Sequence, residues 1–404
     1  MSTAGSRPWP PVPDGSGFAL SHLPYGVFAP AGERARCGVR LGDHVVDLSA
    51  VSVPHGKDFT EPALNTFMSR GPQAWAAVRE RVTELLSEPS HRDSVEQHLY
   101  PVDAVRCLLP WGVADYVDFY SSEHHAKNVG AIFRPEAADL PPNWRYLPIG
   151  YHGRAGTVVV SGTPVVRPCG QRRPPQSDAP DFGPSRRLDI EAEVGFVVGV
   201  PSVQGTRVGA GDLGEHVFGA VLLNDWSARD VQAWEYQPLG PFLGKSFATS
   251  VSAWVTPLAA LAQARVAPPP QDPAPLDYLR DPDPWSLDLA LEVEVAGSVV
   301  SRPPFATMYW TPGQQLAHLT ANGASLRTGD LFASGTVSGP GPGERGSLLE
   351  LSWGGTEPLE LPDGRRLAFL EDGDTVVLRA TAPVVGGGAL TLGEVAGTVR
   401  PAVL

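Results

Sequence analysis

NDWSARDVQAWEY, residues 224–236, follows directly on the apolar run VFGAVLL, residues 217–223. The run predicts a buried β-strand that ends in the carboxylate of Asp225. A helix is expected to start near Ser227 and to carry Arg229, Gln232 and Tyr236, which share one helix face at this spacing. An acid, a cation, an amide and a phenol at the end of one strand indicate a site for an oxygen-rich ligand.

The composition is that of a folded protein with more acidic than basic residues. The chain has 404 residues, 42% hydrophobic and 19% charged, and a formal net charge of −13. This length allows two domains with full cores. The negative charge argues against a general nucleic-acid partner or an anionic membrane. A small anionic substrate is still compatible with it, because a local cluster of Arg and Lys can outweigh the global sign.

Cysteine usage and hydropathy predict a soluble, cytoplasmic protein. Cys37, Cys107 and Cys169 are far apart and form no CxxC pair, which fits a reducing compartment and offers no thiolate metal site. Residues 1–7 lack the apolar core of a signal peptide. No run approaches the roughly 18 apolar residues of a membrane helix.

The pattern of turns and apolar runs divides the chain into three parts. Residues 1–17, rich in Pro, Gly and Ser, are expected to form a loose arm. Residues 18–110 predict a small β-rich domain, with a hairpin turning at Gly42-Asp43 and a helix that starts near Pro72. Residues 111–404 contain short strands and few helices, one of them over 311–322, and the Pro-rich stretches 168–184 and 257–284 are expected to be surface loops. This predicts a mostly β, α+β architecture.

Paired carboxylates are the first candidates for chemistry. Glu191 and Glu193 lie two apart in DIEAEVGFVV, residues 189–198, so in a strand they point to the same side. Glu292 and Glu294 repeat the local pattern, but the face of the first pair continues into Gly195 and Val197, which suggests burial. With Asp118 and Asp225, the first pair would form an all-oxygen site suited to Ca²⁺ or Mg²⁺. Spacing alone does not bring these four acids together.

Histidines, glycine-rich turns and one lysine supply further candidates. A neutral imidazole suits a general base, and His124, His125 and His152 are all possible from the sequence. Glycines on both sides of Tyr151-His152 suggest a turn that approaches a ligand. Lys245 lies in LGPFLGKSF, residues 239–247, which lacks the spacing of a nucleotide-binding P-loop.

Taken in order, these motifs resemble the fumarylacetoacetate hydrolase family over nearly the whole chain. The segments that carry the resemblance are DYVDFYSS (115–122), GYHGRA (150–155), NDWSARD (224–230), PLGPFLGKSF (238–247), MYW (308–310) and Gly335-Thr336. The resemblance implies an SH3-like N-terminal β-barrel domain, a larger C-terminal β-roll domain and a homodimer. It also implies hydrolysis of the carbon–carbon bond of 4-fumarylacetoacetate, a dianionic diketone.

The resemblance also assigns roles to individual residues. A divalent cation, Ca²⁺ or Mg²⁺, would be held by Asp118, Glu191, Glu193, Asp225, Lys245 and Thr249. The catalytic residues would be His125 as base, Glu350 orienting it, and Arg229, Gln232 and Lys245 around the oxyanion. The substrate contacts would be Tyr120, Arg134, Tyr151, Gln232, Tyr236 and Thr336.

Two departures and two alternatives accompany this assignment. Glu123-His124 replaces an expected Arg-Gln type of pair before His125, and Ala248 replaces a glycine before Thr249. One alternative is another reaction of the same superfamily, such as acylpyruvate hydrolysis or decarboxylation or isomerisation of a 2-oxo diacid. The other is a non-catalytic metal-binding oligomer. The N-terminal domain and the His125–Glu350 pair favour fumarylacetoacetate hydrolysis.

Overall fold

Strands dominate the computed structural model, which describes residues 9–133, 136, 140–174, 177–384 and 386–403. Its largest sheet has 13 strands within these residues. The main path of the sheet runs through β4 (Leu99–Pro101), β3 (His44–Asp47), β2 (Arg36–Leu41), β1 (Tyr25–Pro30), β17 (Trp254–Pro257), β14 (Val217–Asp225), β13 (Ala192–Val198), β22 (Leu331–Ala333), β6 (Tyr116–Phe119) and β7 (Gly150–His152). Three further strands join it at the side, β5 (Val105–Leu108), β8 (Val158–Val160) and β16 (Thr249–Val251).

The apolar run of the opening segment forms β14, a central strand in which every residue is buried. It pairs antiparallel with β13, and Glu193 lies opposite Leu223 in the register. Burial on both faces explains why both strands are almost continuously apolar. The carboxylates of Glu193 and Asp225 are the exceptions in this core, so each of them needs a compensating partner.

The N-terminal strands follow the sequence prediction in their local form. The hairpin of β2 and β3 turns at Gly42, whose φ of +55° is the left-handed conformation that favours glycine. Helix α2 (Pro72–Ser87) buries Val78, Val82 and Leu85 against this sheet. The expected closed barrel is not seen among the described residues, because β1 pairs with β17 and so joins the N-terminal strands to the larger sheet. Of the expected loose arm, residues 9–17 are described, and the Trp9 amide donates to the Leu86 carbonyl.

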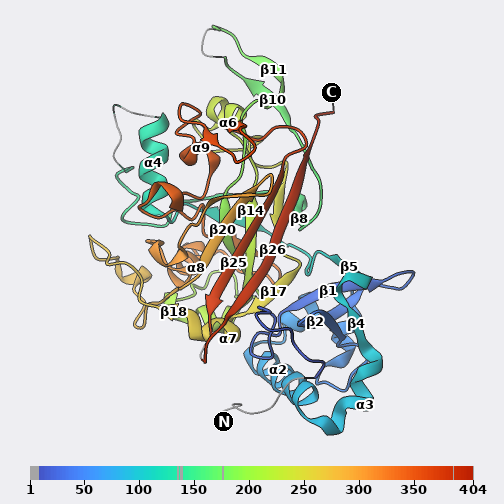
Figure 1. Cartoon of the computed structure of the whole chain (residues 1–404). Helices are drawn as coiled ribbons and strands as arrows, with labels where there is room; N and C mark the ends of the chain where they lie inside the picture. Colours follow the sequence, from blue (N-terminus) through green and yellow to red (C-terminus); the bar gives the residue numbers. More distant parts are fainter. Residues whose placement is uncertain (1–8, 134–135, 137–139, 175–176, 385, 404) are drawn as a thin grey trace.

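A second, five-stranded sheet contains the longest described strand. Its order is β21 (Ser298–Ser301), β20 (Ala290–Val295), β25 (Thr375–Pro383), β26 (Ala389–Arg400) and β9 (Val165–Val166). In Figure 1, β25 and β26 run side by side down the length of the larger part of the molecule, and the N-terminal strands lie beside its lower end. The expected strand-rich architecture with both strands and helices is therefore confirmed.

Four two-stranded sheets complete the strands. They are β10 (Cys169–Arg172) with β11 (Asp181–Pro184), β12 (Leu188–Asp189) with β15 (Ser227–Ala228), β18 (Arg265–Val266) with β19 (Ser286–Leu287), and β23 (Leu359–Glu360) with β24 (Arg366–Leu367). The expected surface loop 168–184 thus contains a hairpin, β10–β11, which projects from the upper end of the molecule in Figure 1.

The helices are short, apart from α2 and α4. The others in the described residues are α1 (Asn65–Met68), α3 (Arg92–Val95), α5 (Leu213–His216), α6 (Arg229–Glu235), α7 (Leu258–Leu261), α8 (Pro312–Thr320) and α9 (Leu348–Leu351), and α4 spans Glu123–Phe133. The helix expected near Ser227 starts at Arg229, because Ser227 and Ala228 form the short strand β15 first. Thr311 caps α8 by accepting from the Gln314 amide.

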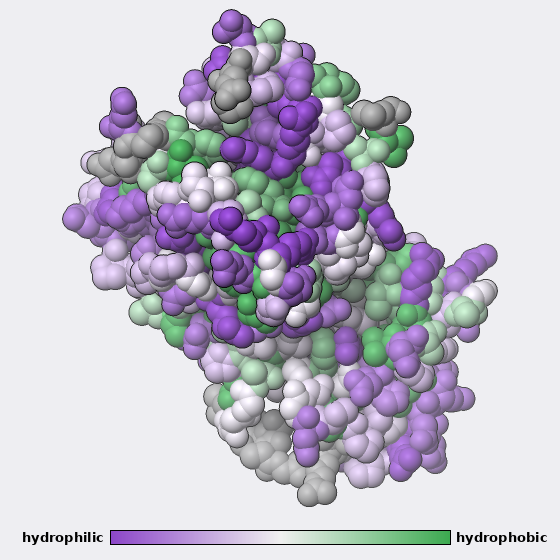
Figure 2. Space-filling model, turned by 45° about the horizontal axis from the view of Figure 1, so that its top comes forward, coloured by the Kyte–Doolittle hydropathy of each residue, from purple (hydrophilic) through white to green (hydrophobic). Residues whose placement is uncertain are grey.

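The surface in Figure 2 is mainly hydrophilic, with smaller hydrophobic areas between the polar side chains. Within the part of the chain that the structure describes, none of the helices combines the length and apolarity that crossing a bilayer requires.

Candidate active site

Four buried carboxylates come together where neighbouring strands of the large sheet end. Asp118 lies on β6, Glu193 on β13, Asp225 at the end of β14, and Glu191 just before β13. Strand β22 lies between β6 and β13, with Ala333 opposite both Asp118 and Gly195, so the sheet itself brings the four acids close. One oxygen from each carboxylate lies within 4.8 Å of the others. The convergence that the sequence pattern left open is therefore real.

The environment distinguishes these acids from the similar pair on β20. Glu191 and Glu193 are buried, 4% and 0% exposed. Glu292 and Glu294 are half-buried, and Glu294 pairs with Arg379 at 2.7 Å. The same two-residue spacing thus gives an ordinary surface ion pair in one strand and a buried acidic cluster in the other.

Two buried cations balance part of the cluster. Lys245 Nζ contacts Glu191 and lies 2.7 Å from Asp225 Oδ2, and Arg229 Nη2 lies 2.7 Å from Glu191 Oε1. Burial works against ionisation of Glu191, but the charges of Lys245 and then Arg229 outweigh it and lower the pKa of this carboxyl. Burial, followed by the charge of neighbouring acids, raises the pKa of Asp118 and Glu193 well above the usual range.

The cluster fits a metal ion in its charge and in its unused oxygens. Lys245 and Arg229 bring two positive charges to the four carboxylates, and Arg229 is shared with Asp189, so at least two negative charges remain for a divalent cation. Among the described residues, Asp118 Oδ1 and both carboxylate oxygens of Glu193 are buried without a hydrogen-bond partner. Such atoms are costly unless a ligand satisfies them. The four carboxylates could therefore hold a metal ion.

Lys245 and Thr249 lie beside the cluster. The charges of Asp225 and Glu191 overcome the effect of burial and raise the pKa of Lys245, so its amine is an ammonium that donates hydrogen bonds. An ammonium has no lone pair for a metal ion. The Thr249 hydroxyl is 3.4 Å from Asp225 Oδ1. Ala248, the departure from the expected glycine, is buried next to a regular pairing of Thr249 with Val158.

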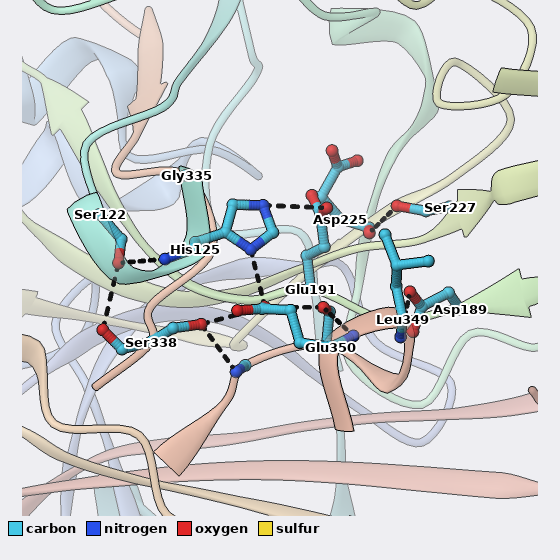
Figure 3. Close-up of polar contacts among 12 residues, drawn as sticks. Ser122, His125, Asp189, Glu191, Asp225, Ser227, Gly335, Ser338, Leu349 and Glu350 are labelled. Carbon is cyan, nitrogen blue, oxygen red and sulfur yellow. Dashed lines mark hydrogen bonds and ion pairs between the residues drawn. The ribbon is translucent and has the colours of Figure 1, made fainter. Parts of the chain in front are cut away.

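His125 and Glu350 form a buried pair, seen in Figure 3 between Ser338 and Glu191. His125 Nδ1 is 2.7 Å from Glu350 Oε2, and Nε2 is 3.9 Å from Glu191 Oε1. Of the three histidines considered from the sequence, His125 lines a cavity of about 440 Å³, whereas His152 has 77% of its side chain exposed and His124 is half-buried. The geometry thus selects His125.

Glu350 is held as a carboxylate by four side-chain donors. Besides His125, they are Asn128 Nδ2 at 2.9 Å, Ser338 Oγ at 3.0 Å and Ser347 Oγ at 2.8 Å. Burial opposes ionisation, but the charge of His125 and these hydrogen bonds lower the pKa of Glu350. Because this carboxylate only accepts, His125 Nδ1 donates to it, and Nε2 is the ring nitrogen left to take up a proton.

Helix α6 presents the predicted face. Arg229 Nη1 donates to Gln232 Oε1 at 3.1 Å. Arg229 Nη2 is close to Glu191 but makes no hydrogen bond of acceptable geometry within the described residues, so a donor is available there. Gly244 allows the loop that carries Lys245 to pack against this helix, because a Cβ at Gly244 would lie 2.8 Å from the backbone nitrogen of Gln232.

A cavity of about 440 Å³ opens onto these groups. Thr336 lines the cavity, and the residue before it has to be a glycine. Gly335 has a φ of +76°, and a Cβ added there would lie 2.0 Å from the carbonyl oxygen of Phe119. The predicted residues that line the cavity are Asp118, Tyr120, His125, Tyr151, Glu191, Arg229, Gln232, Tyr236, Lys245 and Thr336. Glu193, Asp225, Thr249 and Glu350 do not line this cavity, although Asp225 lines a second one beside Tyr151 and Lys245, and Arg134 is outside the described residues.

Two predicted contacts differ in detail from expectation. The Tyr151 hydroxyl, expected at the substrate, donates to Asp225 Oδ2 at 2.8 Å, so Tyr151 also orders the acidic cluster. Glu123, part of one of the two sequence departures, pairs with Lys127 and Arg145, each at 2.6 Å. Its charge is therefore compensated away from the ring of His125.

The sequence interpretation missed the residues that support the site from behind. Asn128 could have been found, since it lies three residues after His125 and shares its helix face. Ser338 and Ser347 carried no signal, because isolated serines in loops are common. Asp189 was also missed, although it lies two residues before Glu191. It accepts a hydrogen bond of 2.7 Å from Arg229 Nε.

Fold and site together define a strand-rich protein with a cavity lined by both apolar and polar side chains, a histidine–glutamate pair and a buried acidic cluster that could hold a metal ion. Comparison with known proteins identifies the group. The models "Fumarylacetoacetase N-terminal" and "Fumarylacetoacetate (FAA) hydrolase C-terminal" match residues 21–110 and 115–400. The chain belongs to the fumarylacetoacetate hydrolase family.

Similar proteins include fumarylacetoacetases from animals and plants. The chain is 46% identical to the Homo sapiens fumarylacetoacetase, with 98% of this chain and 99% of the relative covered. It is 44% identical to that of Arabidopsis thaliana, with 89% and 90% covered. Among solved structures, fumarylacetoacetate hydrolase of Exiguobacterium antarcticum has a TM-score of 0.54 at 18% identity, with 94% of this chain and 99% of that chain covered. The maleylpyruvate hydrolase of Sphingobium gives 0.53 at 15%, with 94% and 100% covered. These structural matches show the fold.

Proposed function

We propose that this chain hydrolyses 4-fumarylacetoacetate to fumarate and acetoacetate, the last step of tyrosine and homogentisate breakdown. The observation that carries the proposal is the His125–Glu350 pair beside Arg229, Lys245 and the acidic cluster, all at one cavity. Relatives named fumarylacetoacetase, at up to 46% identity over nearly the full chain, support the choice of substrate.

The reaction begins with water attacking one carbonyl carbon of the diketone. His125 Nε2 takes a proton from this water, since Nδ1 is held protonated by Glu350. General-base assistance of this kind typically contributes about 10²–10⁴-fold to the rate. Glu350 keeps the ring oriented and stabilises the positive charge that forms on it.

The tetrahedral alkoxide requires donors that are in place before the reaction. Arg229 Nη2, the amide of Gln232 and Lys245 Nζ line the cavity and supply them. Each fixed donor of this type is worth roughly 3–4 kcal/mol in comparable sites. Arg229 and Lys245 are buried and paired, so little reorganisation is needed as the oxyanion develops.

Collapse of the alkoxide breaks the bond to the carbon between the two carbonyl groups. The electron pair of that bond goes to this carbon and its neighbouring carbonyl, and protonation then gives acetoacetate. A divalent cation held by Asp118, Glu191, Glu193 and Asp225 would supply Lewis-acid stabilisation of this charge. We propose Ca²⁺ or Mg²⁺, since the donors are all oxygen. Lys245 and Thr249 would complete the surroundings of the ion.

Substrate contacts follow from the lining of the cavity. Tyr120, Tyr151, Tyr236 and Thr336 line it, and the buried Thr336 hydroxyl has no hydrogen-bond partner among the described residues, so it is free to bond a substrate oxygen. Arg134 remains a prediction from the family resemblance, as the partner of a substrate carboxylate.

The test is turnover of synthetic fumarylacetoacetate, followed as loss of diketone absorbance. Wild-type protein should be active with Ca²⁺ or Mg²⁺ and inactive after chelation, and restoring the ion should restore the rate. His125→Asn should lower kcat by about 10²–10⁴-fold. His152→Asn, at an exposed histidine, is the matched control and should keep full activity. A folded, cation-loaded wild type without turnover would overturn the proposal.

The same assay separates the alternatives. Acylpyruvates and 2-oxo diacids offered in parallel would reveal another superfamily reaction. A protein that binds the cation but turns over none of these compounds would be the non-catalytic oligomer. The intact base, donors and acidic cluster favour catalysis.

We further propose a homodimer, a cytoplasmic location, and an SH3-like domain (18–110) followed by a β-roll domain (111–404). The two family models support this division, and three free cysteines fit a reducing compartment. Exposed apolar side chains near α6 and the β10–β11 hairpin support association, among them Phe182, Trp234, Leu239, Phe242 and Leu243. Light scattering of the intact protein tests the dimer, and a monomer at micromolar concentration would contradict it.

A further inference from the structure

Asp189 is a buried acid outside the cavity and outside the acidic cluster. Its exposure is 0%, and it ends the short strand β12, which pairs with β15 directly before helix α6. The cost of burying a carboxylate has to be balanced by partners. The identity of those partners shows what this residue does.

Both oxygens of Asp189 are fully engaged. Oδ2 accepts from Arg229 Nε at 2.7 Å and from the Leu349 amide at 3.0 Å. Oδ1 accepts from the Leu348 amide at 2.7 Å and from the Ile190 amide at 2.7 Å. Figure 3 shows Asp189 next to Leu349, on the side of Glu350 that faces away from Ser122.

These partners belong to the two halves of the catalytic arrangement. Arg229 supplies a donor to the cavity, and its Nη groups reach Gln232 and Glu191. Leu348 and Leu349 begin α9, the helix whose third residue, Glu350, orients His125. The carboxylate of Asp189 therefore binds both Arg229 and the start of α9, the helix that carries Glu350.

The geometry points to Asp189 as a positioning residue that holds Arg229 and Glu350 in register across the active site. It does not line the cavity, so it acts through these partners rather than on the substrate. With Nε held by Asp189 and Nη1 by Gln232, the guanidinium plane is fixed, and Nη2 is directed towards the cluster and the cavity. This inference rests on the proposed hydrolase activity.

Asp189→Asn is the direct test. An amide keeps the size but replaces one acceptor oxygen by a donor that faces N–H groups, which releases either Arg229 or α9. We expect kcat to fall by about 100-fold, as for loss of a fixed oxyanion donor. KM should change by less than about threefold, since the lost interaction acts in the transition state.

The matched control is another buried aspartate paired with an arginine. Asp47 is 3% exposed and lies 2.5 Å from Arg36 Nε, on β3 in the N-terminal part of the sheet. Asp47→Asn should lower the melting temperature without changing kcat. Equal loss of kcat in both variants would mean general destabilisation and would overturn the inference.

A double-mutant cycle separates positioning from a purely structural role. A lysine at position 229 keeps the positive charge but lacks the Nε and Nη1 atoms that Asp189 and Gln232 hold in the arginine. Asp189→Asn should therefore lower kcat by less than about tenfold in an Arg229→Lys background. A full 100-fold loss there, or unchanged kcat in the folded single variant, would overturn the inference. If Asp189→Asn does not fold, Asp189→Ser, which leaves room for water, carries the same comparison. Failure of the wild type to turn over the diketone would instead overturn the proposed function.

Discussion

Two kinds of buried carboxylate lie within the same active-site region, and their partners differ. Asp189 and Glu350 each accept four hydrogen bonds from protein donors. Asp118 and Glu193, equally buried, have oxygens without a partner among the described residues. The first kind is complete within the chain and can serve only to hold other groups. The second kind is incomplete within the described residues, and a cation is a partner that could satisfy its unpaired oxygens.

The difference has an electrostatic counterpart. The pKa of Glu350 is lowered by His125 and its hydrogen bonds, in spite of burial. The pKa of Glu193 is raised well above its usual range, first by burial and then by the charge of Asp118. At Glu350 the charge of His125 and the donors outweigh burial, and at Glu193 the neighbouring acids add to the effect of burial. At Asp189 burial outweighs Arg229 and the amide donors, so the pKa of this acid is raised in spite of its four hydrogen bonds. Three predictions test this distinction.

The largest effect is expected at Glu350. In Glu350→Gln, an amide N–H₂ would face donors such as Asn128 and Ser347, so the orientation of His125 is lost. We expect kcat to fall by about 10²–10⁴-fold, as when the partner that sets a catalytic imidazole is neutralised. Stopped-flow or steady-state turnover of fumarylacetoacetate measures it. Glu294→Gln, on the half-exposed face of β20, is the control and should keep kcat; full activity of Glu350→Gln would contradict the complete-shell interpretation.

The second prediction concerns stability with and without the cation. A cation at 100 times its Kd should stabilise the wild type against unfolding by about 2.7 kcal/mol. Without cation, Glu193→Gln should be at least as stable as the wild type, because it removes an acid that lacks partners. Under the same conditions the free energy of unfolding of Asp189→Asn should be about 1–3 kcal/mol lower than that of the wild type, because the substitution disrupts the four hydrogen bonds that Asp189 accepts.

Urea unfolding with and without Ca²⁺ or Mg²⁺ measures both effects. Glu193→Gln should also lose most of the response to cation. The distinction between the two kinds of acid would fail if both substitutions destabilised the cation-free protein equally.

The sequence predicts the features that depend on local residue patterns, and it misses those that depend on contacts between distant segments. Periodicity found β14, the Gly42 hairpin and α2, since these depend on local patterns of apolar residues and turns. Family motifs found His125 and Glu350. The sequence favoured Glu191–Glu193 over Glu292–Glu294 only through the continuation of its face into Gly195 and Val197, since the burial itself comes from the neighbouring strands β14 and β22.

Asp189, which supports the site from behind, could not be predicted from the sequence for a related reason. Asp189 gains its importance from amides at positions 348 and 349, about 160 residues further along the chain. No local spacing encodes such a contact. The start of α6 was also misplaced by two residues, because pairing of β15 with β12 is a contact with a distant segment.

The smallest predicted effect extends the comparison to a buried base. His22 has 0% exposure; its Nδ1 lies 2.9 Å from the Gly17 carbonyl oxygen and its Nε2 2.9 Å from the Thr256 hydroxyl oxygen. Burial, aided by the charges of Arg79 and Arg40, lowers the pKa of His22 from 6.5 to about 3. Both nitrogens of the neutral ring thus have a hydrogen-bond partner. The ring links the N-terminal part of the chain to β17.

A lowered folded-state pKa fixes the sign of the pH effect. Above pH 6.5 the ring is neutral in both states, and its contribution to stability is fully present. As the pH falls from 6.5 towards 3, the unfolded chain binds a proton that the folded chain does not, so stability declines by at most about 1.4 kcal/mol per pH unit. Between pH 7 and 5, wild type should lose about 2 kcal/mol more than His22→Gln in urea unfolding. His152→Gln, at an exposed ring, should follow the wild type; identical slopes for wild type and His22→Gln would show that the ring is not held neutral.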